Sequence, residues 1–234
     1  MTVMDLNPLW ISLKTALLAT AITFILGIAA ARWMAGRDFG GKSLLDGIFI
    51  LPLVLPPTVV GFILLYIFGR NAILGALFFE LGRPIVFSWS ATVISAVVVA
   101  FPLMYQTARG AFEQIDANIE DAARTLGASE WTVFWHITIP LAWPGIAAGT
   151  ILAFARSLGE FGATLMLAGN IPGKTQTIPI AIYFLVQAGK SEQAITWVLI
   201  ILIISLASIV ALNYWRKYQQ RRLKPVAREV YSDA

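Results

Sequence analysis

Gly36 to Ser43 reads GRDFGGKS, and its residue types and spacing match a loop that binds nucleotide phosphates. In such a loop, backbone amides and a lysine ammonium hold the phosphates of ATP or GTP. That chemistry requires a preceding strand and a following helix within an α/β domain. Here a short loop joins two apolar runs, and there is no room for such a domain. The stretch therefore predicts a flexible basic turn and not an ATPase site.

Arg156 and Glu160 are a second pair that could do chemistry, because both lie in a largely apolar region. Charges at membrane depth are costly and normally face a partner or a cavity. Residues four apart share one helical face, so one prediction is a pair that neutralises itself and fixes helix packing. The other is that Arg156 attracts a passing oxyanion while Glu160 keeps it from becoming a trap. The sequence supports both equally.

Residues near this pair and in an earlier run predict a translocation path. Gly159, Gly162 and Thr164 form a flexible, hydroxyl-bearing stretch that we expect at an outward gate, together with Phe161. Pro56 and Pro57, with a further proline at position 52, remove amide donors and predict local unwinding. Such backbone is tolerated at membrane depth only inside protein or beside water, and broken helices often line a transport path. The alternative is a merely kinked helix.

Several kinds of site are excluded by residue type. The chain has no Cys, which excludes disulfides, thiolate metal sites and cysteine nucleophiles. Its single His, His136, leaves no histidine cluster for zinc and is expected to be an interfacial hydrogen-bonding residue. A membrane-embedded enzyme would need convergent acids, His or Cys, so we predict no covalent chemistry and no cofactor bound by this chain.

The composition predicts a bilayer protein. Hydrophobic residues make up 58% of the chain and charged residues 13%, and the mean hydropathy is +0.76, whereas soluble domains are about 45 to 50% apolar and about 25% charged. Apolar runs of about 20 residues suit a hydrocarbon core about 30 Å thick. Five such runs predict an all-α membrane protein with one transmembrane domain over residues 1–234. The predicted spans are residues 10–32, 45–69, 85–108, 139–168 and 194–215.

A sixth apolar stretch, Thr177 to Ala188, is too short to cross and predicts a re-entrant gate helix on the outer side. With five spans and the N-terminus outside, most lysines and arginines collect in the cytoplasm, as the positive-inside rule expects. The cytoplasmic positions are 32, 37, 42, 109, 124, 216, 217, 221, 222, 224 and 228, against 14, 70, 83, 174 and 190 outside. The basic tail over 216–234 suits anionic lipid or a partner protein. Basic residues that flank apolar runs in this way do not indicate nucleic-acid binding.

Residues 117–128 predict an amphipathic helix between the third and fourth spans. Asn118 with Asp121 approximates a capping box, and Gly127 is placed to end the helix in a left-handed conformation. The apolar side chains at 119, 122, 123 and 126 share one face. The spacing alone allows two interpretations, a helix that docks on a partner or one that lies on lipid headgroups with nearby tryptophans as anchors.

A family resemblance decides between these interpretations. Asp121-Ala122-Ala123, then Gly127, then Ile137-Thr138-Ile139-Pro140 resembles the E-A-A-x3-G-x9-I-x-L-P signature of ATP-binding-cassette importer permeases. Two positions depart from it, Asp121 for Glu and Ile139 for Leu, and the neighbouring Glu120 can supply the longer carboxylate. The stretches LPLVLPPTVVG, FPLM, AARTLGA and FARSLGEFGATLMLAGNIPG are similar to the molybdate permeases of that family, and LGEFG and GNIPG are shared with sulfate and thiosulfate permeases.

The resemblance implies the type I importer permease fold and a homodimer with the path between subunits. It also implies a cytoplasmic ATPase homodimer that binds ATP and Mg, and a periplasmic or tethered protein that delivers the oxyanion. The substrate expected from it is molybdate or tungstate, with sulfate or thiosulfate as the alternative. A self-sufficient secondary transporter, the rival class, would need ion-coupling residues and usually internal repeats, and neither is clear.

In that family the amphipathic helix is a coupling helix that fits a cleft on the ATPase and carries ATP-driven closure into the spans. The residues expected in this coupling helix are Glu120, Asp121, Ala122, Ala123, Arg124, Leu126 and Gly127. Those expected along the path and gate are Pro56, Pro57, Arg156, Glu160, Phe161, Gly162 and Thr164.

Overall fold

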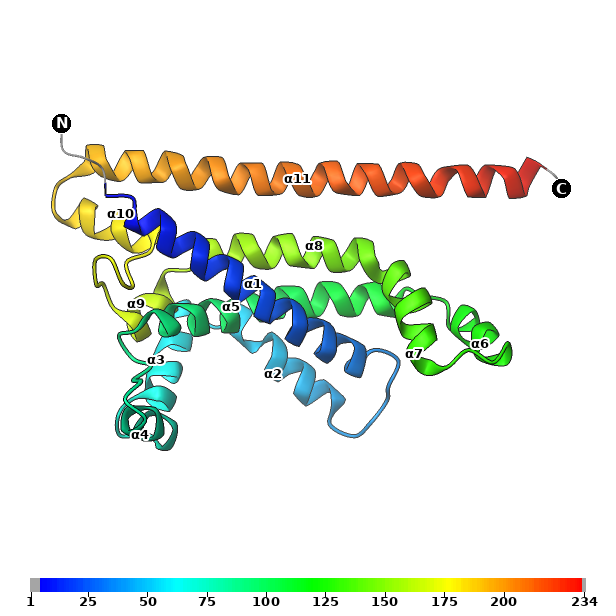
Figure 1. Ribbon diagram of the computed structural model, residues 1–234, viewed down its shortest axis with the longest axis horizontal. Helices are drawn as coiled ribbons and strands as arrows, with labels where there is room; N and C mark the ends of the chain where they lie inside the picture. Colours follow the sequence, from blue (N-terminus) through cyan, green and yellow to red (C-terminus); the bar gives the residue numbers. More distant parts are fainter. Residues whose placement is uncertain (1–4, 233–234) are drawn as a thin grey trace.

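The computed structural model describes residues 5–232, and over this range it contains helices and no strand, as predicted (Figure 1). In chain order these are α1 (Asn7–Met34), α2 (Lys42–Val54), α3 (Pro57–Phe68), α4 (Ile73–Glu80), α5 (Trp89–Glu113), α6 (Ala117–Thr125), α7 (Glu130–Val133), the π-helix η1 (Phe134–Thr138), α8 (Ile139–Leu158), α9 (Gly162–Ala168), α10 (Ile178–Gln187) and α11 (Ser191–Ser232). The predicted basic tail falls in the last part of α11. Its side chains, and residues 233 and 234, lie outside the described part of the chain.

Four segments of the described chain are long and apolar enough to cross a membrane, by length and composition. They are Asn7–Met34, Trp89–Glu113, Glu130–Leu158 and Ser191–Ala211. The pair α2 and α3 passes the same test only when taken together, and it is bent by 113° at its break, as in a broken span or a re-entrant loop. These segments overlap the five predicted runs, with different bounds. The sixth predicted stretch forms α10, whose ten residues are too few to cross.

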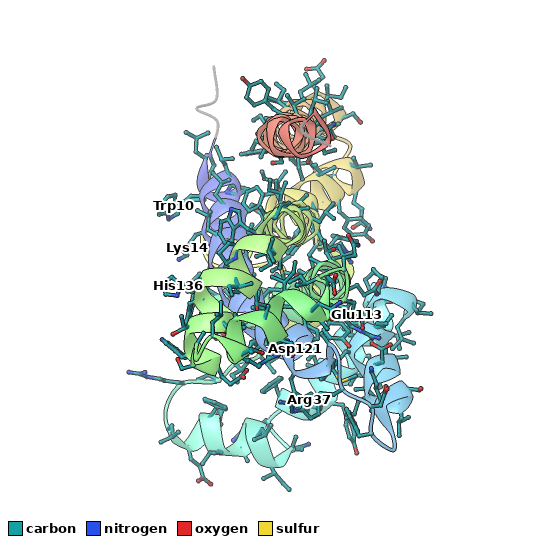
Figure 2. All side chains as sticks on the ribbon, turned by 90° about the vertical axis from the view of Figure 1, so that its right-hand side faces the viewer. Trp10, Lys14, Arg37, Glu113, Asp121 and His136 are labelled. Carbon is teal, nitrogen blue, oxygen red and sulfur yellow. The ribbon has the colours of Figure 1, made fainter. Side chains whose placement is uncertain are left out.

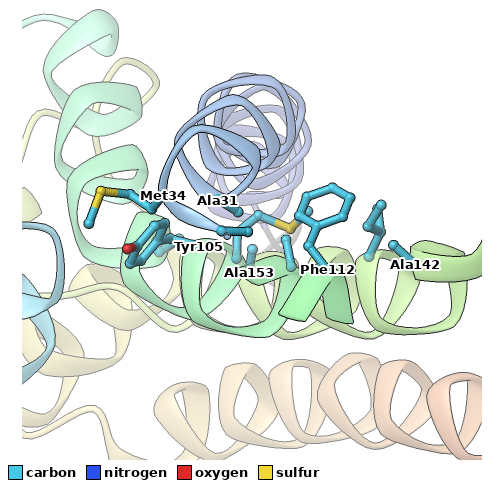
Figure 3. Packing of buried hydrophobic residues seen from close by; sticks show 11 residues of the cluster. Ala31, Met34, Tyr105, Phe112, Ala142 and Ala153 are labelled. Carbon is cyan, nitrogen blue, oxygen red and sulfur yellow. The ribbon is translucent and has the colours of Figure 1, made fainter. Parts of the chain in front are cut away.

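Helices α1, α5 and α8 pack together and form the core. The largest buried cluster takes its side chains from these three helices and from Ala35, which directly follows α1. Met34, Tyr105 and Ala142 are among them (Figure 3). Small residues allow the close approach. A Cβ atom on Gly149 would lie 3.0 Å from the sulfur of Met104 and 3.2 Å from Cβ of Thr107. The seam between α5 and α8 therefore has no space for a side chain there.

The second predicted span is broken at Pro56, where unwinding was predicted, but it is not broken at Pro52. Pro52 lies inside α2, and the chain leaves the helix at Leu55 and Pro56. The preceding GRDFGGKS stretch connects α1 to α2, with Gly41 in the left-handed conformation at φ +91° and Lys42 as the first residue of α2. Two helices flank it, so it is the predicted turn.

The fourth predicted span differs from the prediction, because it is not one helix over 139–168. The helical segment begins earlier, at Glu130, and α8 ends at Leu158. Gly159 follows as its cap, and Phe161 leaves helical geometry at φ −129° and ψ −59°. Glu160 therefore lies beyond the end of α8 and does not share a helical face with Arg156. The prediction treated a charged residue inside an apolar run as part of the helix.

Other boundaries also moved. The third span begins at Trp89 and not at residue 85, because the side chain of Ser88 caps α5. The amphipathic helix begins at Ala117 and is capped by Asp116, whose carboxylate accepts a hydrogen bond from the amide of Asn118 at 3.0 Å. The predicted cap was Asn118, two residues later. Gly127, at φ +86°, follows the helix in the left-handed conformation as predicted.

Candidate functional site

Helix α6 projects from one end of the bundle and leaves most of its apolar face uncovered. Figure 2 looks onto this end, which we call the α6 end, with Asp121 and Glu113 labelled. Ile119 and Ala122 are exposed, and Leu126 is 89% exposed. Exposed apolar side chains on a short helix outside the spans indicate a surface that another molecule covers. This chain does not cover it within residues 5–232.

The opposite side of α6 is fastened to two membrane helices through Glu120. The hydroxyl of Thr138, in η1, donates a hydrogen bond of 2.6 Å to Oε1 of Glu120. Nη2 of Arg32, in the last turn of α1, lies 3.6 Å from Oε2. A partly buried carboxylate with an ionic partner and a hydrogen-bond partner holds its helix more firmly than an exposed pair does. A displacement of α6 is therefore passed directly to α1 and to the helix that continues into α8.

Arg124 organises the charged side of α6. Its guanidinium bonds to Glu130 at 2.6 Å, to Asp121 at 2.7 Å and to Glu120 at 3.1 Å. The hydrogen bonds that Arg124 donates to Glu130 and then to Asp121 raise the pKa of Arg124 above its ordinary value. The charged side chains of α6 are thus paired within the chain. Asp121 remains exposed and can still contact a partner.

Glu160 is a buried charged residue at the opposite end of the bundle from α6. Its side chain is 2% exposed. Oε2 lies 2.8 Å from Nη1 of Arg156, and Oε1 accepts a hydrogen bond of 2.8 Å from the amide of Ala163. The carboxylate thus neutralises the arginine and also holds the first turn of α9. The predicted ion pair exists, with an additional backbone contact that the sequence did not indicate.

The predicted gate residues of α3 and α9 meet at a backbone contact. A Cβ atom on Gly162 would lie 2.9 Å from Cβ of Pro57, so the two helix starts touch. Thr164 is buried beside them, and the ring of Phe161 lies 5.2 Å from that of Tyr183 in α10. The structure therefore brings these residues together with α10 at one end, which we call the α9 end, and places them far from α6 (Figure 1).

We expect Gly61→Ala to loosen the contact between α3 and α9. Its Cβ would lie 2.7 Å from Cβ of Met166 and 2.8 Å from Cα of Ala163, too close without a shift of backbone. Overpacking of this kind costs about 1–3 kcal/mol, so the apparent unfolding temperature of the purified protein should fall. The control is Gly47→Ala in α2, where a Cβ meets nothing and helix propensity gains up to about 1 kcal/mol. Equal unfolding temperatures for the two variants would contradict the close contact.

A polar cluster between α2 and α5 was missed by the sequence reasoning. Asp46 accepts hydrogen bonds from the hydroxyl of Tyr105, at 2.7 Å, and from the guanidinium of Arg109. Arg109 also bonds to Glu113 at 2.7 Å. This cluster holds α2 against α5 near the α6 end. The signal available in the sequence was Asp46 itself, the one acid at the start of an apolar run, but its partners lie about 60 residues away.

Most of the chain matches one family of known proteins. Residues 10–225 match the family described as "binding-protein-dependent transport system inner membrane component". The chain belongs to this family. A permease of this kind is a membrane subunit of a transport system, which agrees with the apolar helices described above.

Individual relatives and structures narrow the comparison. The permease is 44% identical to the molybdenum transport system permease protein ModB of Haemophilus influenzae, over 94% of this chain and 97% of that protein. It is 48% identical to ModB of Escherichia coli K12, over 80% and 83%. A protein of Chlorokybus atmophyticus whose name assigns it to sulfate transport is 32% identical, over 92% and 75%. In fold, the permease resembles a bacterial ABC transporter involved in alginate import, with 16% identity, coverage of 93% and 80%, and a TM-score of 0.73.

Proposed function

We propose that this permease is the membrane subunit of an ATP-driven importer that moves a tetrahedral oxyanion, molybdate or the similar tungstate, into the cytoplasm. The observation that carries the proposal is the similarity of nearly the whole chain to proteins named as molybdenum transport permeases. The protein named for sulfate transport is more distant, which makes sulfate the second candidate. Family membership in a binding-protein-dependent system also supports import with a soluble binding protein over a self-sufficient secondary transporter.

The proposed division of labour follows from the two ends of the bundle. The α6 end carries an uncovered apolar face beside paired charges, which suits a cleft on a cytoplasmic ATPase homodimer that binds ATP and Mg. In this proposal the permease transmits the motion of the ATPase to the membrane spans and does not itself hydrolyse ATP. The N-terminus then lies outside and the C-terminus in the cytoplasm, in keeping with the basic residues near α6. A second copy of the permease completes the path between subunits.

At the α9 end, the proposed gate is made of the broken span and the break between α8 and α9. Arg156 is the cation closest to this break in the chain, and Glu160 neutralises it. An oxyanion delivered by a periplasmic or tethered protein meets a charge that is already paired, so it passes without being held. The ion pair can therefore both stabilise helix packing and take part in a gate, and substitutions of Glu160 distinguish the two roles.

The experiment that tests the proposal is uptake of labelled molybdate by cells that lack this gene and by cells in which it is restored. Tungstate and sulfate are added as competitors. Restored uptake that tungstate blocks and sulfate does not is the expected result. Restored sulfate uptake would move the substrate to the second candidate, and no uptake of either anion would contradict the oxyanion assignment.

A further inference from the structure

A cavity lies at the α6 end, between α1 and α6. It has a volume of about 600 Å³ and lies where the last turn of α1, the loop after it, the start of α6 and Phe134 of η1 meet. Three arginines and one acid line it, namely Arg32, Arg37, Arg124 and Glu120. The lining is therefore positive, in a part of the chain that joins the proposed coupling helix to a membrane helix.

Two of these arginines have unused hydrogen-bond donors. Arg124 is engaged by three carboxylates and has little to offer a ligand. Arg32 has one ionic contact, at 3.6 Å from Glu120, and donates no hydrogen bond to a described residue. Arg37, labelled in Figure 2, makes neither a hydrogen bond nor an ion pair within residues 5–232. A guanidinium carries five N–H donors in a planar fork that matches phosphate oxygens.

The rest of the cavity lining is apolar, which distinguishes the kind of anion that fits. Ile28 and Ala29 line it on the side of the membrane helix, and Trp33 is exposed at its edge with its ring 5.5 Å from that of Phe39. Exposed tryptophans at the ends of spans mark the headgroup level of a bilayer. An anion that is both charged and attached to apolar chains satisfies both sides of this cavity, whereas a free inorganic anion satisfies only the arginines.

We propose that this cavity binds the phosphate group of an anionic phospholipid, with Arg32 and Arg37 as its ligands and the apolar side facing the lipid's glycerol and acyl chains. Basic pockets beside membrane helices recognise anionic headgroups in this way. The bound phosphate would lie next to the contact between Arg32 and Glu120, so the lipid stabilises the junction of α1 and α6. The proposal rests on the proposed function only for the leaflet, which would be the cytoplasmic one.

The test is the binding of phosphatidylglycerol to the purified full-length permease, measured by native mass spectrometry against phosphatidylcholine. We expect Arg32→Gln/Arg37→Gln to weaken retention of phosphatidylglycerol about tenfold or more, since each basic residue contributes about 1 kcal/mol near an anionic surface. The matched control is Arg70→Gln/Arg83→Gln, which removes the same charge from the α4 region. Arg37→Gln alone, in a loop with no described partner, should give part of the loss without affecting the fold.

Three results would overturn the proposal. Equal loss of phosphatidylglycerol in the double variant and its control would indicate general attraction to charge. Unchanged retention in the double variant would remove the arginines from the site. Binding of inorganic phosphate in phosphatidylcholine nanodiscs, with the same arginine dependence and no preference for phosphatidylglycerol, would assign the cavity to a free anion. None of these measurements depends on transport, so the proposed function can fail or succeed separately.

Discussion

Leu126→Asp should abolish oxyanion uptake while the permease still inserts and folds. Leu126 directly follows α6 and is 89% exposed, and it makes the end of the uncovered apolar face. A carboxylate there would have to be desolvated in an apolar cleft, at a cost of several kcal/mol. The ATPase should therefore no longer co-purify with the permease, and uptake should fall at least about 100-fold, as a loss of about 3 kcal/mol implies.

The matched control for this variant is Leu81→Asp. Leu81 directly follows α4 as Leu126 follows α6, and it is 65% exposed at the other end of the bundle. If α6 only rests on lipid headgroups, both substitutions should leave the ATPase bound, and the docking proposal would be wrong. Loss of co-purification in the Leu126 variant alone would establish the surface. The amount of each variant in the membrane is measured in parallel.

Glu160→Ala should uncouple ATP hydrolysis from uptake. The substitution removes the partner of Arg156 and the acceptor for the amide of Ala163, so α9 loses the contact that holds its first turn. Breaking a buried ion pair from one side costs about 3–5 kcal/mol, which is enough to change the population of a gate by more than 100-fold. We expect ATP hydrolysis by the assembled complex to continue while uptake falls to background.

Glu160→Gln separates the two roles of this side chain. Glutamine keeps an oxygen that can accept from Ala163 but no longer neutralises Arg156. If only the hydrogen bond with the amide of Ala163 matters, Glu160→Gln should retain most of the uptake. The negative charge of Glu160 would then not be needed for transport. Wild-type uptake in Glu160→Ala would contradict the gate proposal altogether. Loss of both the permease from the membrane and ATP hydrolysis by the assembled complex would identify a purely structural pair.

The parts of the fold that could be predicted were those encoded by local spacing. The five apolar runs and the amphipathic stretch that became α6 follow from periodicity and length, and Gly127 ends the helix because few other residues adopt its left-handed conformation. These features depend on residues that are near each other in the chain.

The parts that could not be predicted depend on residues that are far apart in the chain. The anchor of α6 needs Arg32 and Glu120, which lie 88 positions apart, and no spacing in either segment indicates the other. The end of α8 at Leu158 was missed because hydropathy does not detect a break that a buried carboxylate stabilises. Helix α4 was missed because its eight residues are too few to show a helical period.

The position of α11 has a consequence for biosynthesis. This helix follows α1 to α10 in the chain and therefore leaves the ribosome after them, and among its described residues only Ala194 and Trp197 are buried. Every buried member of the largest core cluster lies between Ala31 and Ala153. The nascent chain therefore contains that whole cluster before α11 enters the membrane. Helix α11 then joins a bundle whose core can already have packed. The apolar surface of α11 is left to contact lipid or a neighbouring subunit during assembly.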